Sequence, residues 1–246
     1  MRRDHNDQAG DEALSPSGKS ASRPPTSPAS SWQQWRAFFL PAVLLVAAMA
    51  ALAVDCPLAQ WRREHVCPGE LQNLLQSCEP FGDGVGVLLI VLAIHQLDPR
   101  RRWALPRILA CAWGAGLVAN LIKLLVVRVR PRDFDFQGGV WTTFGGWFAW
   151  TGAGNGGQSF PSGHAATAAG LAAALIWLYP QGRKLFPLMV VLVACHRIEA
   201  GAHYLSDVLS GAAVGVIVAT ACLGTGRLAR WFDRLENRWR SRSTHT

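Results

Sequence analysis

The sequence predicts an all-α fold, a six-transmembrane helical bundle, and two observations support this prediction. Half of the 246 residues are hydrophobic, and they gather into long blocks instead of alternating with polar residues in amphipathic periods. The basic residues, which give a formal net charge of +8, concentrate in the two tails and in short gaps between the blocks. Because these cations form no face of a soluble domain, nucleic acid is excluded as a partner.

The amino-terminal residues 1–31 are predicted to form a disordered tail. They are rich in Ser, Pro and charge, and they cannot bury enough apolar surface to offset the entropy of ordering. No apolar stretch of a signal peptide occurs before Phe38, so the first hydrophobic block is expected to act as an uncleaved signal anchor. Residues 32–226 then form the six-span domain, and residues 227–246 form a basic cytoplasmic tail.

A membrane-spanning helix needs about 20 mostly apolar residues, and fewer where polar groups line a pocket. The block at 104–127 meets this requirement most clearly, and the block at 185–200 is the weakest. Three ionisable residues, His196, Arg197 and Glu199, interrupt the weak block near its carboxyl-terminal end. The predicted spans are residues 38–54, 81–97, 104–127, 165–179, 185–200 and 207–223.

The charges between these spans predict their orientation. Both tails and the short links at 98–103 and 181–184 are basic, and six spans place all four on one side of the membrane. The positive-inside rule identifies that side as the cytoplasm. We therefore expect an integral protein of a bacterial plasma membrane with both termini in the cytoplasm. The segments 55–80, 128–163 and 201–206 then face the periplasm or the exterior.

Three of the six cysteines share the first long loop: Cys56, Cys67 and Cys78. If this loop faces an oxidising space, two of them could form a disulfide and leave the third free. The sequence does not select the pair. The other three cysteines lie in or beside apolar blocks, where we expect small core residues.

Glycine and aromatic residues are mixed throughout residues 132–158. Aromatic side chains commonly lie at the level of the lipid headgroups, and glycine adds backbone freedom. This composition predicts a mobile lid that touches lipid.

Two cations lie close together near the end of the third predicted span. Arg130 follows Lys123 after seven positions, which correspond to about two helical turns. Both side chains therefore face the same side if the helix continues to Pro131, where it must stop. Two cations that converge at a membrane face predict an anion-binding site.

A polar turn, Pro161-Ser162-Gly163-His164, leads into the fourth predicted span. Ser162 is a favourable helix cap, and Gly163 allows a ligand to approach the backbone closely. The free amides at the start of such a helix bind anions. His164 closes the turn beside these amides.

A third cluster consists of Arg197, His203 and Asp207. His203 and Asp207 are four positions apart, so they are neighbours if the sixth helix begins just before them. A carboxylate that accepts a hydrogen bond from one imidazole nitrogen fixes the tautomer and leaves the other nitrogen as a nucleophile. Each cluster alone also fits a structural role, but all three fall on the same side of the predicted topology. Ionisable residues in such places mark a functional site.

Taken in order, the three motifs resemble those of the type-2 phosphatidic acid phosphatase superfamily, which includes vanadium haloperoxidases and soluble bacterial acid phosphatases. They keep the family's order and spacing over roughly residues 104–223. The resemblance implies a metal-independent membrane phosphatase that needs no cofactor and forms a phosphohistidine. Its expected substrate is an amphiphilic lipid phosphate or diphosphate, such as phosphatidate, phosphatidylglycerol phosphate, an isoprenyl diphosphate or a lipid A phosphate.

The resemblance also implies a role for each motif residue. His203 would attack phosphorus, Asp207 would orient His203, and His164 would protonate the leaving alkoxide. The phosphate oxygens would be held by Lys123, Arg130, Ser162, Gly163 and Arg197.

One position departs from the family pattern. The third motif usually opens with Ser-Arg, whereas His196 precedes Arg197 here. This removes one hydroxyl from the implied phosphate site, and the resemblance gives no role to the neighbouring carboxylate of Glu199.

Two alternatives have the same motifs. A haloperoxidase is disfavoured because those proteins are soluble. A non-catalytic phospholipid-binding or transport protein would need only the cations, so the His203–Asp207 pair and His164 argue against it. The sequence leaves open the lipid headgroup, the choice between monophosphate and diphosphate, and the oligomeric state.

Overall fold

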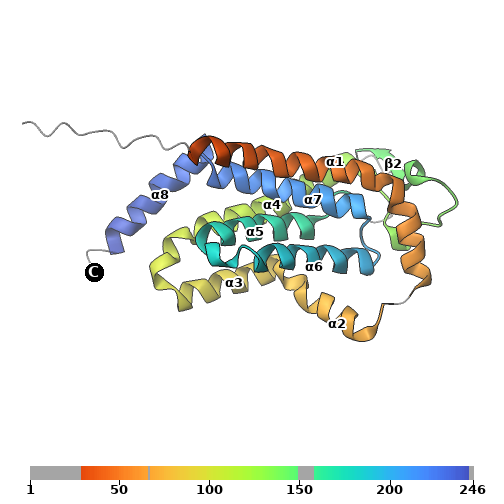
Figure 1. Cartoon of the computed structure of the whole chain (residues 1–246), viewed down its shortest axis with the longest axis horizontal. Helices are drawn as coiled ribbons and strands as arrows, with labels where there is room; N and C mark the ends of the chain where they lie inside the picture. The colour runs from red at the N-terminus through yellow and green to blue at the C-terminus, as the bar shows by residue number, and fades with distance from the viewer. Residues whose placement is uncertain (1–28, 66, 149–157, 244–246) are drawn as a thin grey trace, which may run out of the picture.

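The computed structural model describes residues 29–65, 67–148 and 158–243, and most of them are helical (Figure 1). The amino-terminal half contains α1 (Ala29–Glu64), α2 (Gly69–Cys78), α3 (Gly84–Leu97) and α4 (Leu105–Leu125). The carboxyl-terminal half contains α5 (Gly163–Leu178), α6 (Leu185–Glu199), α7 (Leu205–Leu223) and α8 (Arg227–Ser243). Short 3-10 turns link them: η1 (Glu79–Phe81), η2 (Pro99–Ala104), η3 (Pro131–Asp133), η4 (Val140–Thr143) and η6 (Pro180–Gly182).

All six predicted apolar blocks form helices, but fewer than six are long enough to be clear membrane spans. Among the described residues, three helical stretches qualify: Phe38–Glu64, Pro99–Leu125 and Leu205–Leu223. A fourth qualifies if Gly69–Phe81 and Gly84–Leu97, which meet at a bend of 68°, count as one span. The 16 residues of α5 and the 15 of α6 fall short of the roughly 20 that a span usually needs. The chain is an integral membrane protein, while the predicted number of six spans is not confirmed.

A small antiparallel ribbon corrects the all-α prediction. It pairs β1 (Val126–Arg128) with β2 (Phe144–Trp147), and Val127 lies opposite Gly146. The predicted span at 104–127 therefore ends as a helix at Leu125. The β-branched valines that follow Leu125 fit a strand better than a helix. Residues 149–157 of the predicted lid lie outside the described residues.

Helix α5 is the centre of the bundle and contacts α4, α6 and α7. Its buried face consists of small residues, which let the neighbouring backbones approach closely. A Cβ added to Gly170 would lie 2.3 Å from the carbonyl oxygen of Cys111 in α4. One added to Gly215 in α7 would lie 2.4 Å from the carbonyl oxygen of Ala166. This close packing sets the amino end of α5 beside the neighbouring ends of α4 and α7.

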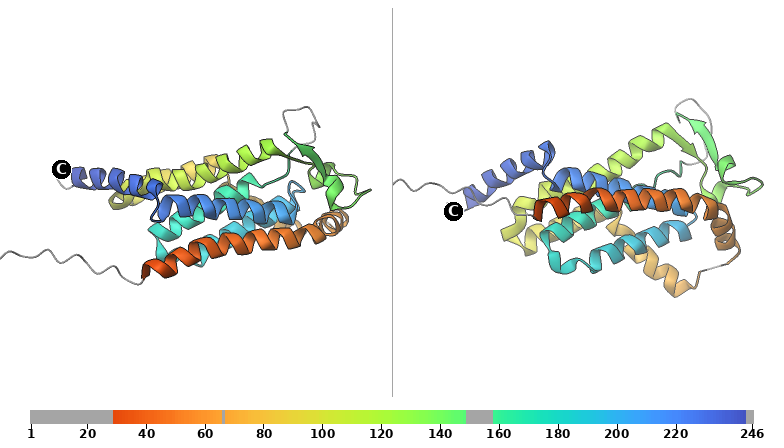
Figure 2. Two further views of the ribbon diagram at one scale, coloured as in Figure 1. Left: turned by 90° about the horizontal axis from the view of Figure 1, so that it is seen from above. Right: turned by 45° about the horizontal axis from the view of Figure 1, so that its top comes forward.

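The bundle is elongated, and its two ends differ (Figures 1 and 2). The β ribbon and the turn between α6 and α7 lie at one end, and α8 lies at the other. The predicted tail 227–246 is thus helical over most of its length. It is held to α4 by Arg107, which lies 2.6 Å from both Asp233 and Glu236.

Two further predictions concern the amino-terminal part. Helix α1 begins at Ala29, inside the predicted tail 1–31, and residues 1–28 lie outside the described residues. All six cysteines are free thiols in the described structure, so the possible disulfide among Cys56, Cys67 and Cys78 is not formed.

Candidate active site

The three sequence motifs meet at one end of the bundle. Lys123 lies in the last turn of α4, and the Ser162–Gly163–His164 turn opens α5. A Cβ added to Gly163 would lie 4.0 Å from Nζ of Lys123, so the first two motifs are in close contact. This proximity follows from the close packing of α4 against α5.

The third motif joins the same cluster. Lys123 interacts electrostatically with Arg130 and Arg197, and Arg197 also interacts with Arg130. His203 lies close enough to Lys123 and Arg197 to interact with both charges, and His164 interacts with Arg197 and His203. The predicted residues of all three motifs therefore surround one polar site.

Ser162 caps α5 as the sequence predicts. Its hydroxyl oxygen accepts a hydrogen bond from the amide of Ala165 at 3.4 Å, and its side chain is fully buried. The amide of Ser162 donates to the carbonyl oxygen of Asp207 at 3.0 Å. A Cβ added to Gly211 in α7 would lie only 2.3 Å from the carbonyl oxygen of Ser162. The amide-rich start of α5 is therefore held directly by the α7 backbone.

The tautomer of His203 follows from its surroundings. Nδ1 of His203 lies 2.7 Å from the carbonyl oxygen of Ser159. A carbonyl oxygen can only accept, so Nδ1 carries the proton and Nε2 keeps its lone pair. Burial lowers the pKa of His203 below its ordinary value, although Asp207 acts in the opposite direction. The imidazole is therefore neutral at pH 7, with one nitrogen available as a nucleophile.

Asp207 does not make the direct hydrogen bond to His203 that the sequence predicts. Its Oδ2 lies 3.8 Å from Nδ1 of His203, which is longer than a hydrogen bond. Oδ2 instead accepts from the amide of Tyr204 at 2.8 Å and from the hydroxyl of Ser159. The reason is that α7 begins only at Leu205, so His203 precedes its first turn. Ser159 thus connects the histidine to the carboxylate.

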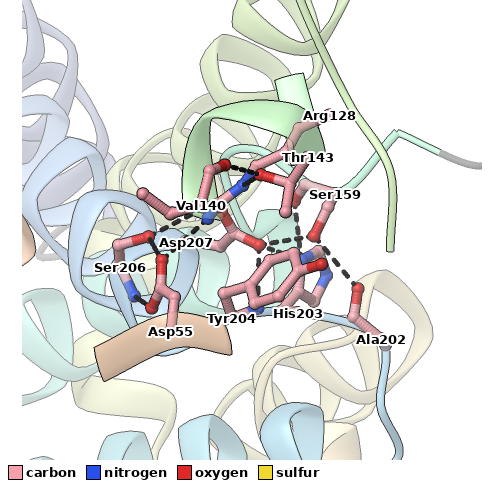
Figure 3. Close-up of polar contacts among 10 residues, drawn as sticks. All are labelled: Asp55, Arg128, Val140, Thr143, Ser159, Ala202, His203, Tyr204, Ser206 and Asp207. Carbon is pink, nitrogen blue, oxygen red and sulfur yellow. Dashed lines mark hydrogen bonds and ion pairs between the residues drawn. The ribbon is translucent and has the colours of Figure 1, made fainter. Parts of the chain in front are cut away.

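A buried arginine behind this pair was not predicted to belong to the site. The side chain of Arg128 is fully buried and lies among polar residues from α1, η4 and the start of α7 (Figure 3). Its Nη2 donates to Asp55 at 2.7 Å, and its Nε donates to Thr143 at 3.1 Å. Its Nη1 donates to the hydroxyl of Ser206 at 2.8 Å and to Asp207. The network joins α1 to the amino-terminal end of α7.

The sequence contained one signal for this network. Asp55 and Arg128 each follow directly on a predicted span, where an isolated charge is costly and needs a partner. Their pairing was not predictable, because 73 positions separate them in the chain. Ser159 and Tyr204 gave no comparable signal.

Two cations of the site have unused hydrogen-bond capacity. The Nε atoms of Arg130 and Arg197 are buried, and neither finds a hydrogen-bond partner within the part of the chain that the structure describes. Buried donors normally have partners. An anion with several oxygens, such as a phosphate group, would satisfy them, and the amides at the start of α5 would add further donors.

Two glutamates near the third motif have different partners. Glu199 pairs with Arg62 of α1 at 3.5 Å, which accounts for the carboxylate that the resemblance left without a role. Glu79, which the sequence gave no reason to select, lies 2.6 Å from Nη1 of Arg197. It also lies 3.9 Å from His196, the residue that departs from the family pattern.

Comparisons with known proteins identify the family of the chain. The PAP2 superfamily model matches residues 103–231, more than half of the chain. A lipid A 1-phosphatase of Rhizobium etli is 28% identical over 199 residues, which cover 74% of this chain and 81% of that protein. A decaprenylphosphoryl-5-phosphoribose phosphatase of Mycobacterium tuberculosis is 34% identical over 165 residues, which cover 65% and 84%, respectively.

A solved structure has the same fold. The crystal structure of a transmembrane PAP2-type phosphatidylglycerolphosphate phosphatase from Bacillus subtilis matches with a TM-score of 0.54 at 20% identity. The match covers 82% of this chain and 96% of that chain. With its motifs gathered in one site and its sequence matched over more than half its length, this membrane phosphatase belongs to the PAP2 superfamily.

Proposed function

We propose that the protein hydrolyses the phosphate monoester or diphosphate of a membrane lipid through a phosphohistidine on His203, without a metal ion. The observation that carries the proposal is the state of His203. Its Nδ1 proton is held by the Ser159 carbonyl, which leaves Nε2 free beside the cations Lys123 and Arg197. A neutral, oriented imidazole next to an anion site is suited to attack phosphorus.

The reaction follows from these residues in two steps. Nε2 of His203 attacks phosphorus while the bond from phosphorus to the lipid oxygen breaks, and His164 gives that oxygen a proton. A water molecule then attacks the phosphohistidine, gives its proton to His164 and releases inorganic phosphate. Lys123, Arg130 and Arg197, together with the Ser162–Gly163 turn, would stabilise the negative charge on the phosphoryl oxygens in both steps.

The same cations support a mechanism that needs no metal. In phosphoryl transfer, catalysis consists largely of positioning and of stabilising charge on the transferred group. Three cationic side chains and a helix amino terminus supply the positive charge that a metal would otherwise supply.

A lipid substrate is supported by two observations. The motif residues lie at one end of a bundle whose helices are apolar enough to cross a membrane, and an end of such a bundle would lie at the level of the lipid headgroups. The names of the two relatives describe phosphatases of lipid A and of a decaprenylphosphoryl sugar, both of which are amphiphilic phosphates. Phosphatidate, phosphatidylglycerol phosphate, isoprenyl diphosphates and lipid A phosphates are therefore the substrates to test.

We also propose that six helices cross the membrane, with both termini in the cytoplasm and the site facing the periplasm or exterior. The basic tails and the basic links at 98–103 and 181–184 support this orientation. Labelling of single cysteines with a membrane-impermeant reagent in intact cells tests it. A cysteine placed in the 98–103 link should stay unlabelled, and one placed near Asp135 should react.

The decisive experiment is phosphate release from this lipid panel by the purified full-length protein. His203→Ala should lower turnover by at least about 10³-fold, because it removes the group that forms the covalent intermediate in this mechanism. His95→Ala, in the last turn of α3, is the matched control and should retain full activity. EDTA should have no effect, and orthovanadate should inhibit.

Three results would count against the proposal. Phosphate release from none of the lipids would remove the enzymatic function. Equal activity of His203→Ala and the unmodified protein would remove the phosphohistidine. Inhibition by EDTA that Mg²⁺ reverses would contradict the metal-free mechanism. A non-catalytic lipid-binding protein would retain lipid binding without any turnover.

A further inference from the structure

A carboxylate from the amino-terminal third of the chain reaches into the phosphate site. Oε1 of Glu79 lies 2.6 Å from Nη1 of Arg197 and 3.4 Å from Nε2 of His164. Oε2 lies 3.9 Å from Nδ1 of His196. Glu79 therefore contacts residues of both the second and the third motif, although it lies outside the region 103–231 that the family model matches.

The fold fixes the position of this carboxylate. Glu79 is the first residue of η1, which packs against α5 and α6, and the preceding helix α2 also packs against α6. A Cβ added to Gly82 would lie 2.7 Å from the carbonyl oxygen of His164 and 2.9 Å from Val193. Glycine is thus needed for η1 to approach the start of α5. Backbone packing, and not a long loop, therefore brings Glu79 to the site.

A carboxylate at this place repels a bound phosphate group. Its presence in the site therefore calls for another function that outweighs this cost. It occupies Nη1 of Arg197 and leaves the buried Nε of that guanidinium for another acceptor. It also faces an imidazole, and a nearby carboxylate favours the protonated form of an imidazole. Burial lowers the pKa of His164 to about 4, and Arg197 and His203 act in the same direction, whereas the carboxylates of Glu79 and Asp83 oppose them.

Resting on the proposed phosphatase function, we propose that Glu79 is a positioning residue for protonation of the leaving group. Its carboxylate lies beside Nε2 of His164, which leaves Nδ1 for the leaving oxygen, and its charge favours the imidazolium that donates the proton. His196, which stands where the family usually has serine, lies on the side of the other carboxylate oxygen. Its Nδ1 is 3.9 Å from that oxygen, which is too far for a hydrogen bond, so any effect of His196 on Glu79 comes from packing beside it.

The proton balance is complete without any further reactant. The His164 imidazolium gives its Nδ1 proton to the lipid oxygen as the phosphorus–oxygen bond breaks, and its Nε2 proton stays directed at Glu79. In the second step, Nδ1 takes a proton from the attacking water while the bond from phosphorus to Nε2 of His203 breaks. The imidazolium is then restored.

The test is the pH dependence of kcat for Glu79→Gln, which keeps the shape of the side chain and removes its charge. The substrate is the lipid of the panel that the unmodified protein hydrolyses fastest. Loss of the charge should move the basic limb of the profile to lower pH by about one unit and lower kcat above the optimum by roughly tenfold. Glu79→Asp, which keeps the charge, should lie between the two.

The matched control is Glu70→Gln in the first turn of α2, an exposed position on the same segment, and it should not move the profile. His196→Ser should shift the basic limb in the same direction as Glu79→Gln but less. An unchanged basic limb in Glu79→Gln would overturn the proposal. A higher kcat in that variant would also overturn it, because Glu79 would then only compete with the phosphate.

A measurement without turnover separates this inference from the proposed function. The imidazole of His164, identified by its absence in His164→Ala, is titrated by NMR in detergent with inorganic phosphate present. Its midpoint should be lower in Glu79→Gln than in the unmodified protein and unchanged in Glu70→Gln. If no lipid is hydrolysed, the phosphatase function fails while this titration still decides whether Glu79 acts on His164. Equal midpoints would refute the interaction.

Discussion

Arg128 and Arg197 lie at the same end of the bundle, and their guanidinium groups are used in opposite ways. Arg128 is fully buried, and each of its three nitrogen atoms donates to a side chain from α1, η4 or the start of α7. Two of its partners are carboxylates, so its charge is more than balanced.

Arg197 has one carboxylate partner and retains unused hydrogen-bond capacity. Its side chain is 15% exposed, Glu79 is its nearest carboxylate, and its Nε has no partner among the residues described. An arginine whose donors all have protein partners stabilises the fold, whereas an arginine with an unused donor can bind a ligand. The number of satisfied donors therefore separates the two roles better than burial does.

The largest change in stability is expected from Arg128→Ala. Removing the cation leaves Asp55 and Asp207 buried without compensation, which should lower the free energy of unfolding by about 3–5 kcal/mol. Unfolding in mixed micelles of dodecyl maltoside and SDS measures it. Arg100→Ala, at an exposed position of the basic link, is the control and should change stability by less than about 0.5 kcal/mol. Equal stabilities would mean that the buried network contributes little.

Arg197→Ala should instead impair activity much more than stability. We expect kcat/KM to fall by about 10²–10³-fold, because a donor to the phosphoryl oxygens is lost, while stability changes far less than in Arg128→Ala. Arg197→Lys restores charge without the paired donors and should recover only part of the activity. Phosphate release and mixed-micelle unfolding are measured on the same preparations. A large loss of stability with normal turnover would assign Arg197 to the fold instead.

The protonation state of His203, the proposed nucleophile, gives a further prediction. Because burial lowers its pKa, the imidazole should still be neutral as the pH falls through about 6.5, the ordinary value for histidine. An NMR titration, with the His203 signal identified by its absence in His203→Ala, should give a midpoint below that value. A midpoint at or above 6.5 would mean that much of the site is inactive in mildly acidic medium.

The smallest effect is expected from Glu199→Gln. This carboxylate pairs with Arg62 at 3.5 Å near the protein surface, and such pairs contribute only about 0–1 kcal/mol. Both turnover and stability should stay close to those of the unmodified protein. An activity loss comparable to that of Glu79→Gln would show that the two glutamates were assigned the wrong way round.

The helices and the motif cluster were predictable because their signals are local. Long apolar runs predicted the helical segments, and Ser162 before an apolar run predicted its own helix cap. The placement of all three motifs at the same end of the bundle followed from helices that run in alternating directions, because the basic links between them lie at the other end. The exact helix ends did not follow, since pairing with Gly146 turned Val127 into a strand residue at the end of an apolar run.

The partners that complete the site were not predictable, because their contacts join distant parts of the chain. Glu79 and Arg197 are 118 positions apart, and Asp55 and Ser206 are 151 positions apart. The hydrogen bond of His203 went to a backbone carbonyl, an acceptor that every residue has and that no sequence pattern marks. Local spacing therefore predicted Asp207 as the direct partner, and tertiary packing placed Ser159 between them.

The contact of Gly211 with the Ser162 carbonyl has a consequence for how such proteins diversify. Main chain packs on main chain there, so the start of α5, where we propose that phosphate binds, has little room to change its position. For the proposed lipid phosphatase, we therefore expect a change of preferred lipid to require changes in other helices and loops, which would meet the rest of the substrate. Reaction chemistry and substrate choice can in this way change independently during evolution.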